Sequence, residues 1–387
     1  MNQGAVMTLL KQFLPLAALL LLLIVPTETE VVASVKDCDE FFLKQTPPNI
    51  TRILKGGEIL NQNRYKLICQ TLNNTRTFVT LYDTQNKIPV FSAAKFNGNI
   101  SGRPDIWMIE PQLENTTDNP NMRPSNDSID YENQAGDKDY KHNRDFNRGH
   151  LFPNSYGSTD LKKNSTFTLT NIVPQNEHFN GGSWRRMEEC IKCVLNKYCI
   201  NNNGNIEGFV VIGAQPSNNS LNKSTNKTIN IPSVLWSAFC CYSDSQKSWL
   251  ASAHWGKNVD DRPKNLKTRT LGKLHRELEI EVFPETECPK NTTVTHLYSN
   301  LPYNCSCRNT SIKSAPTTST ASASVSASSS STSFSSPGTS VPLSTTSGKS
   351  TTAPMSTTIA SVKKFKVNEN DVKGKHFLGP KKKKIPI

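Results

Sequence analysis

Two short segments near the middle of the chain restrict most strongly what it can fold into and do. The first, residues 147–154, reads Asn-Arg-Gly-His-Leu-Phe-Pro-Asn. The second begins with Asn-Ile-Val-Pro-Gln at 171–175 and continues as Asn-Gly-Gly-Ser-Trp-Arg-Arg-Met-Glu at 180–188. A neutral His accepts a proton from water, an Arg holds a phosphate, and Asn and Glu oxygens bind a hard divalent cation. These residue types predict hydrolysis of a phosphodiester.

The order and spacing of these residues resemble the DNA/RNA non-specific endonuclease family. The shared features are Arg-Gly-His, Asn-x-x-Pro-Gln, and Asn-x-Gly-x-Trp with a Glu four residues after the Trp. Flanking residues 65–70 and 80–84 are most similar to its secreted branch, the endonuclease domain-containing 1 proteins. The resemblance runs from about Asp37 to Glu285. It implies an α+β, ββα-metal nuclease fold, in which two strands deliver the His, a helix delivers the metal ligand, and helices flank a central, mainly antiparallel sheet.

Three residues are expected to carry the central chemistry. His150 is the candidate general base that deprotonates the attacking water, although a His without such neighbours is more often structural. Asn180 is the candidate direct ligand of Mg²⁺, with Mn²⁺ as the other cation that the sequence allows; the alternative role is a helix N-cap. Glu188 would orient metal-bound water, against the alternative of a solvent-facing helix Glu. Eight helical residues rotate Glu188 by about 80° from Asn180, which keeps both near one side.

Two arginines complete the predicted site. Arg148 would add a fixed cation beside the phosphate. Arg103 aligns by position with a family Arg that helps hold the scissile phosphate, and the alternative is a surface Arg. The resemblance implies endonucleolytic cleavage of DNA and RNA with little base preference, leaving 5′-phosphate ends, because contacts to backbone phosphates carry no sequence information. Asn147 departs from the family, which usually has Asp before Arg-Gly-His. This change would weaken the water network around the metal, or have little effect if Asn keeps the hydrogen bonds.

Periodicity predicts the order of the elements around these motifs. We expect a helix or turn at 41–43, a helix from Asn180 to about Tyr198, a mixed helical pattern at 273–282, and strands at 65–69, 77–82, 89–95, 166–173, 208–214, 233–242 and 248–255. Within the long helix, Trp184, Met187, Ile191 and Leu195 should face the core. Residues 111–146 read as a long polar loop that could cover the site, and 216–231 as an exposed, glycosylated insertion.

The C-terminal quarter cannot form a packed core. Residues 311–361 are Ser/Thr-rich and resemble an O-glycosylated, mucin-like linker. Residues 362–387 contain nine lysines against Glu369 and Asp371, which places +7 of the net charge of +13 in this basic tail. We expect the tail to contact a polyanion or the cell surface, with a merely solvated tail as the alternative. One endonuclease domain, 37–290, and a Cys-containing extension, 291–310, precede the linker.

The N-terminus and the cysteines indicate export. Residues 1–33 have the pattern of a signal peptide, with an uncleaved anchor as the alternative, and the mature chain should begin between Thr27 and Lys36. No later segment is long and apolar enough to predict a transmembrane span. The ten cysteines allow up to five disulfides whose pairing the sequence leaves open, and Cys190-x-x-Cys193 favours disulfides over zinc. Asn-x-Ser/Thr sequons begin at Asn49, Asn73, Asn99, Asn115, Asn126, Asn164, Asn218, Asn222, Asn226, Asn291, Asn304 and Asn309.

The sequence therefore predicts a secreted, glycosylated, disulfide-bonded, Mg²⁺-dependent endonuclease acting on DNA and RNA. Two other hypotheses remain. One is a catalytically impaired nuclease-fold glycoprotein that binds nucleic acid or other polyanions, which Asn147 favours. The other is a mucin-like surface glycoprotein, which leaves the central motifs unexplained. The sequence does not indicate an oligomeric state.

Overall fold

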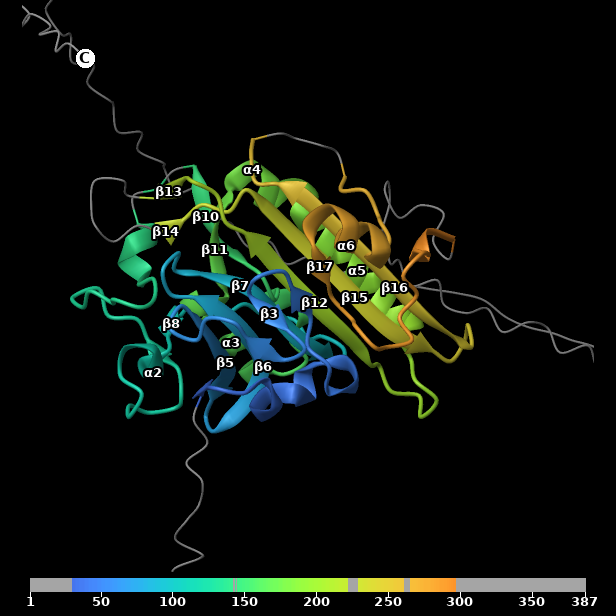
Figure 1. Ribbon diagram of the computed structural model, residues 1–387, viewed down its shortest axis with the longest axis horizontal. Coiled ribbons are helices and arrows are strands. Elements are labelled where there is room, and N and C mark those ends of the chain that lie inside the picture. Colours follow the sequence, from blue (N-terminus) through green and yellow to red (C-terminus); the bar gives the residue numbers. More distant parts are fainter. Residues whose placement is uncertain (1–29, 142, 144, 222–228, 261–264, 297–387) are drawn as a thin grey trace, which may run out of the picture. The chain divides into compact units, whose positions relative to one another are not determined.

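A seven-stranded sheet organises the computed structural model, which describes residues 30–141, 143, 145–221, 229–260 and 265–296. The strand order is β1-β5-β6-β7-β12-β15-β16, and every neighbouring pair is antiparallel. The bounds are β1 Val31–Val32, β5 Tyr65–Leu72, β6 Thr75–Asp83, β7 Ile88–Phe96, β12 Gly208–Gln215, β15 Val234–Ser243 and β16 Ser248–Lys257 (Figure 1). All described residues belong to one compact unit, Met1–Ser314. The antiparallel sheet and most of its predicted strands are confirmed.

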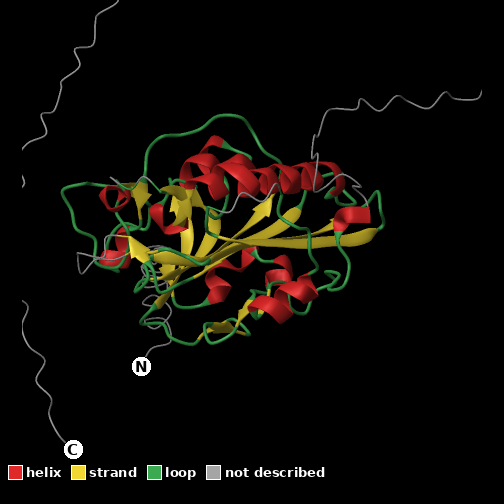
Figure 2. Ribbon diagram, turned by 90° about the horizontal axis from the view of Figure 1, so that it is seen from above, coloured by secondary structure: helices red, strands yellow, loops and turns green. Residues whose placement is uncertain are grey.

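Both faces of this sheet are covered, as Figure 2 shows with helices on either side. Successive side chains of a strand point to opposite faces, so Val210 and Ile212 of β12 join one core and Phe209 and Val211 join the other. Helix α5 (Arg185–Tyr198) packs on the first face, and α6 (Leu271–Leu278) packs on the second. The residues predicted to face the core from the long helix are buried, which confirms its amphipathic pattern: Trp184, Met187, Ile191 and Leu195.

The predicted strand at 166–173 is wrong. Residues 169–171 form the short 3-10 turn η5 (Leu169–Asn171), and the strand β11 (Ile172–Asn176) starts only afterwards. Two of the threonines in the alternating pattern, Thr168 and Thr170, are buried because their hydroxyls donate hydrogen bonds to the buried carboxylate of Glu110. The alternating sequence pattern here thus reflects a buried hydrogen-bonded network and not a β-strand.

Shorter helices and strands lie outside the seven-stranded sheet. The segment predicted as a polar loop, 111–146, contains α2 (Pro111–Glu114), β9 (Arg123–Pro124) and the 3-10 helix η3 (Asp137–Tyr140), and it buries Gln134 and Tyr140 against the body of the domain. Further short elements are η1 Val35–Phe41, η2 Leu43–Gln45, β2 Asn49–Ile50, β3 Leu54–Lys55, β4 Glu58–Ile59, β8 Met108–Ile109, α3 Asp160–Ser165, β13 Ser220–Leu221, β14 Ile229–Asn230, β17 Ile280–Glu281 and η7 Val294–His296.

Disulfides fasten both layers to the sheet. Adjacent residues Cys240 and Cys241 point to opposite faces of β15: Cys240 is bonded to Cys288, and Cys241 is bonded to Cys199 at the end of α5. Cys190 and Cys193 are also disulfide-bonded, which confirms the expectation of disulfides at this pair. Each such bond typically stabilises a domain by about 2–4 kcal/mol. The predicted cysteines of the extension, Cys305 and Cys307, lie outside the described residues.

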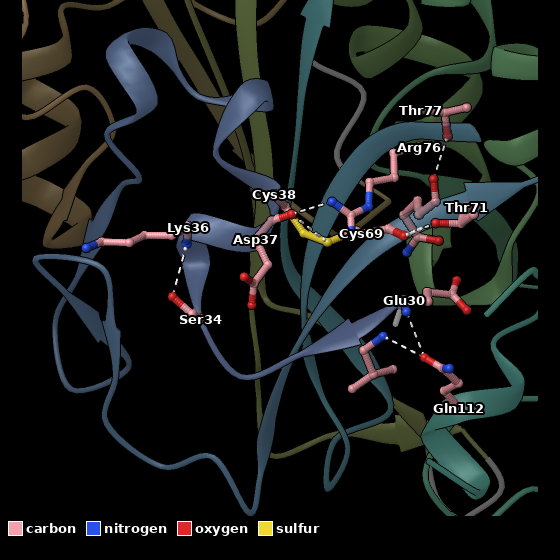
Figure 3. Close-up of a disulfide and its surroundings, with 12 residues drawn as sticks. Glu30, Ser34, Lys36, Asp37, Cys38, Cys69, Thr71, Arg76, Thr77 and Gln112 are labelled. Atoms are coloured by element: carbon pink, nitrogen blue, oxygen red, sulfur yellow. Dashed lines mark hydrogen bonds between the residues drawn. A yellow bond between two sulfur atoms is a disulfide. The ribbon is translucent and has the colours of Figure 1, made fainter. Parts of the chain in front are cut away.

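A further disulfide holds the N-terminal segment (Figure 3). Cys38 is bonded to Cys69 on β5, and Arg76 donates to the backbone carbonyl of Asp37 beside it. Upstream, Cys69 N–H donates to the Glu30 carbonyl, and strand β1 pairs with β5. Residues 30–33, the end of the predicted signal peptide, thus lie within the folded domain.

Other predicted segments cannot be compared with this structure. The first 29 residues, sequons Asn222, Asn226, Asn304 and Asn309, the linker and the basic tail fall outside the described residues. Within the described ranges, no helix has both the length and the apolar character needed to cross a membrane.

Candidate active site

Two strands and a helix build the site. Strand β10 (Phe146–His150) pairs antiparallel with β11, and His150 lies opposite Ile172. Gly149 is required because a Cβ atom there would lie 2.2 Å from the side-chain oxygen of Gln175. The Gly of Arg-Gly-His and the Gln of the Pro-Gln motif thus fit one another sterically. The Asn258 amide attaches this pair of strands to the rest of the domain: it donates to Pro174 O and accepts from Asn176 N–H.

Asn171 locks the chain that follows His150. Its amide oxygen accepts from Phe152 N–H at 2.9 Å, and its amide nitrogen donates to Phe152 O and Thr166 O, each at 3.0 Å. A further hydrogen bond runs from Leu151 N–H to the Asn171 carbonyl. Asn171 is fully buried, so these bonds satisfy polar groups that water cannot reach. The first residue of the Asn-x-x-Pro-Gln motif is therefore structural.

The helix begins earlier than predicted, which corrects the placement of Asn180 at its N-terminal end. Asn176 caps α4 (Glu177–Phe179) by accepting from His178 N–H and Phe179 N–H. A π-helical segment, η6 (Asn180–Trp184), follows and leads into α5. Such a bulge accommodates one extra residue, so the eight residues from Asn180 to Glu188 correspond to about seven α-helical steps, or roughly two whole turns. Asn180 and Glu188 consequently lie on the same side of the helix.

All five residues predicted for the site line one cleft of about 420 Å³: Arg103, Arg148, His150, Asn180 and Glu188. They come from the segment after β7, from β10, from η6 and from α5. The sequence prediction assigned no role to the other residues that line the cleft, which are Pro153, Asn154, Ser155, Gly181, Arg185, Glu189 and Lys192. Cations therefore outnumber carboxylates along its walls, as a phosphate site requires.

His150 lies partly buried among aromatic rings. Its ring centroid is 4.8 Å from that of Phe167 and 5.7 Å from that of Trp107. Burial, assisted by the positive charge of Arg103, lowers the pKa of His150 to about 3. Within the described part of the chain, its Nε2 atom has no hydrogen-bond partner. His150 is thus a neutral imidazole at physiological pH, the form that can accept a proton.

Each of these two aromatic rings packs against one of the predicted arginines. The Arg148 guanidinium lies 4.9 Å from the Trp107 ring centroid, and that of Arg103 lies 5.2 Å from the Phe167 ring centroid. Arg148 also forms a salt bridge of 2.9 Å with Asp137. Sequence reasoning missed Trp107, Phe167 and Asp137. The one available signal for Trp107 was its position four residues after Arg103.

Glu188 is held at the floor of the cleft. Tyr156 donates to its backbone carbonyl at 2.9 Å, which joins the short 3-10 turn η4 (Asn154–Tyr156) to α5. Burial raises the pKa of the Glu188 carboxyl to about 8, while the Trp184 side chain opposes this shift. Burial thus outweighs the nearby positive charges of Lys192 and Arg185, which also lower this pKa, and a cation bound at the carboxyl would favour its ionised form.

The donors suit a hard divalent cation. Asn180 and Glu188 offer an amide and a carboxylate oxygen, the ligand type that Mg²⁺ prefers, and Mg²⁺ usually retains several waters. A Cβ atom at Gly181 or Gly182 would meet no atom within 4 Å, so space is open beside Asn180. Among the described residues, no group of three or more His, Cys, Asp or Glu side chains gathers as a metal cage. A cation here would be bound by few protein oxygens and by water.

Asn147, the departure from the family pattern, is not part of the cleft. It is exposed, and the alternation of β10 points it away from its neighbours Arg148 and His150.

Comparisons with known proteins show the family of this chain. The family model of the DNA/RNA non-specific endonuclease matches residues 57–269. The human endonuclease domain-containing 1 protein is 29% identical over 220 residues, which cover 55% of this chain and 40% of the relative. The mouse protein of that name is 30% identical over 213 residues, which cover 53% of this chain and 38% of the relative. The matched region thus spans less than half the length of either relative.

A solved structure of the EndoG/EndoGI complex aligns with 57% of this chain and 88% of its own, with a TM-score of 0.41 and 15% identity. The family match covers more than half of the present chain, and it includes every predicted site residue from Arg103 to Glu188. On this basis the chain belongs to the DNA/RNA non-specific endonuclease family.

Proposed function

We propose that this protein is a secreted, metal-dependent endonuclease that hydrolyses phosphodiester bonds of DNA and RNA with little sequence preference. The observation that carries the proposal is the convergence of a neutral His150, two supported arginines, Asn180 and Glu188 in one cleft. These groups come from segments separated by up to 85 residues of sequence, so their convergence is a product of the fold.

The chain's own residues supply most of the reaction. His150, neutral at physiological pH, takes a proton from the attacking water. Arg103 and Arg148 bind phosphate oxygens and balance the charge that develops on them. Asn180 and Glu188 would hold Mg²⁺ or Mn²⁺ directly and through water, and the cation supplies Lewis acidity toward the phosphate and the leaving 3′ oxygen. Because the cleft offers cations to the sugar-phosphate backbone, both DNA and RNA fit it.

Export and glycosylation form part of the proposal. The disulfides support an oxidising compartment. Most sequon asparagines in the described ranges are exposed, namely Asn73, Asn99, Asn115, Asn126, Asn164, Asn218 and Asn291. Asn49 differs because it is only partly exposed and its amide nitrogen, the atom that would carry a glycan, donates to Glu281. We propose glycans at the exposed sites and contact of the basic tail with polyanions or the cell surface.

The alternative is a nuclease-fold glycoprotein that binds polyanions without cleaving them. Asn147 was the sequence feature that favoured it, and this residue lies outside the cleft. The same assay separates both functions: supercoiled plasmid DNA and a structured RNA are incubated with purified protein in Mg²⁺ or EDTA, beside His150→Ala. Cleavage that requires Mg²⁺ and is lost in His150→Ala is the expected result. Nucleic-acid binding without cleavage under all these conditions would favour the alternative.

A further inference from the structure

Lys163 is buried beside the cleft without lining it. It lies on α3, and only 3% of its surface is exposed. A lysine this deeply buried is rare, because its ammonium must find hydrogen-bond acceptors in place of water. The buried position of Lys163 therefore has to be explained by the acceptors that surround its ammonium.

The acceptors of this ammonium come from two different segments. Lys163 Nζ donates to the Ile100 carbonyl, to the Asn154 carbonyl and to the Asn154 amide oxygen, each at 3.2 Å. An ammonium has three N–H donors, so these acceptors match its full capacity. The side chain thus acts as a three-way clamp between Ile100 and Asn154.

Both clamped segments deliver side chains to the cleft. Arg103 follows Ile100 by three residues, and Asn154, which itself lines the cleft, follows His150 by four. The chain between β7 and β8 has no regular secondary structure, so no continuous ladder of backbone hydrogen bonds fixes its position. Its attachments at Ile100 and at Asn99, whose amide oxygen accepts from Asn196, therefore limit where Arg103 can reach.

A second hydrogen bond and tight packing reinforce this attachment. Ile100 N–H donates to the Gly157 carbonyl at 3.0 Å, so both backbone groups of Ile100 are tied to the same region. A Cβ atom at Gly157 would lie 2.5 Å from Lys163 Cγ and 3.0 Å from its backbone nitrogen. The lysine stem therefore fills the space that this glycine leaves, and its ammonium has a defined position.

We propose that Lys163 is a positioning residue that aims Arg103 and Asn154 into the cleft by holding their two segments together. This inference rests on the proposed nuclease function for its kinetic consequence. A lysine suits the role because all three groups to be joined are acceptors, and a single ammonium satisfies them at once.

Hydrogen exchange tests the clamp without requiring activity. In Lys163→Met, the Ile100 amide, which donates to the Gly157 carbonyl, should exchange faster than in the wild-type protein, because the tie to the Ile100 carbonyl is lost. Lys162→Met is the matched control: Lys162 is the adjacent residue of α3, but it donates to the Lys95 carbonyl on β7. Equal exchange of the Ile100 amide in both variants would overturn the proposal.

A double-mutant cycle tests whether Lys163 acts through Arg103. Lys163→Met should lower kcat/KM for plasmid cleavage on the order of 10²-fold, the loss typical of a misplaced catalytic group. In an Arg103→Ala background the same substitution should cost only a few-fold, because its target is already absent. The same loss in both backgrounds would show a merely structural role and overturn the proposal. Lys162→Met should remain close to wild type.

Two further comparisons keep the result interpretable. Circular dichroism and thermal melting show whether Lys163→Met is folded, and Lys163→Gln, which keeps an amide donor, replaces it in both tests if it is not. A wild-type protein that cleaves nothing would contradict the proposed function, whereas the exchange comparison would still decide whether Lys163 fixes the segment that carries Arg103.

Discussion

Arg148 is held between Asp137 and Trp107, with a salt bridge of 2.9 Å to the carboxylate and the indole ring centroid 4.9 Å from its guanidinium. Asp137 belongs to the long segment 111–146, which contacts strand β10 through this pair. Lys141 lies 3.2 Å from the same carboxylate. The segment therefore holds the side chain of Arg148 in place, and some of its own residues are buried against the domain.

Replacing Asp137 should weaken catalysis by releasing Arg148. An ion pair of this kind contributes up to about 1 kcal/mol, so Asp137→Asn should lower kcat/KM by about fivefold or less. Steady-state cleavage kinetics measure this, with Asp118→Asn as the control because Asp118 pairs with Arg123 of the same segment, and neither residue lines the cleft. Faster cleavage by Asp137→Asn would mean instead that the carboxylate competes with the substrate phosphate for Arg148.

Asn147→Asp should change activity little. The side chain is exposed on the face of β10 away from the cleft, where solvent and salt screen a new charge. We expect kcat/KM within about threefold of wild type, as for a surface change worth less than about 0.5 kcal/mol. The same plasmid assay, run beside His150→Ala, measures it. A silent wild-type protein that Asn147→Asp activates would contradict the placement of this residue outside the chemistry.

Asn171→Ala should destabilise the domain strongly. The substitution leaves Phe152 N–H, Phe152 O and Thr166 O without this buried partner, and each unsatisfied group costs about 1–3 kcal/mol. We expect a loss of roughly 3 kcal/mol or more in the free energy of unfolding, measured by urea denaturation. Asn171→Asp, which keeps only the acceptor, should be destabilised as well. A loss below about 1 kcal/mol for Asn171→Ala would show that water replaces the amide.

Glu110 should make folding stability depend on pH outside the active site. Burial raises the pKa of its carboxyl from 4.5 to about 7, although hydrogen bonds from Thr168 and Thr170 oppose the shift. Between those two values the folded protein keeps a proton that the unfolded chain releases, so stability falls as pH rises from about 4.5 to about 7 and then levels off. The contribution of this one group is up to about 3 kcal/mol.

Glu110→Gln isolates that contribution, because an uncharged amide cannot titrate. Urea unfolding at several pH values between 4.5 and 8 should show a smaller decline for this variant than for wild type. Parallel pH profiles for the two proteins would mean that Glu110 ionises normally in the folded state.

The amino-acid sequence by itself predicted the candidate site residues and determined most of the local structure. The Arg-Gly-His and Asn-x-Gly-x-Trp motifs identified His150, Arg148, Asn180 and Glu188, and helical periodicity placed Trp184 in the core. Alternation located the long strands of the sheet. These predictions succeeded because the periods of a helix and a strand are local properties that a short segment contains completely.

Only the tertiary structure decided what surrounds these residues. Asp137, Phe167 and Lys163 reach Arg148, His150 and Asn154 because the chain folds back on itself, and no local pattern encodes such pairings. For the same reason the disulfide partners could not be derived from spacing. The predicted strand at 166–173 failed because the buried Glu110, distant in sequence, satisfies its threonines. A periodic pattern records which side of a segment is buried, but packing between distant segments determines what that side meets.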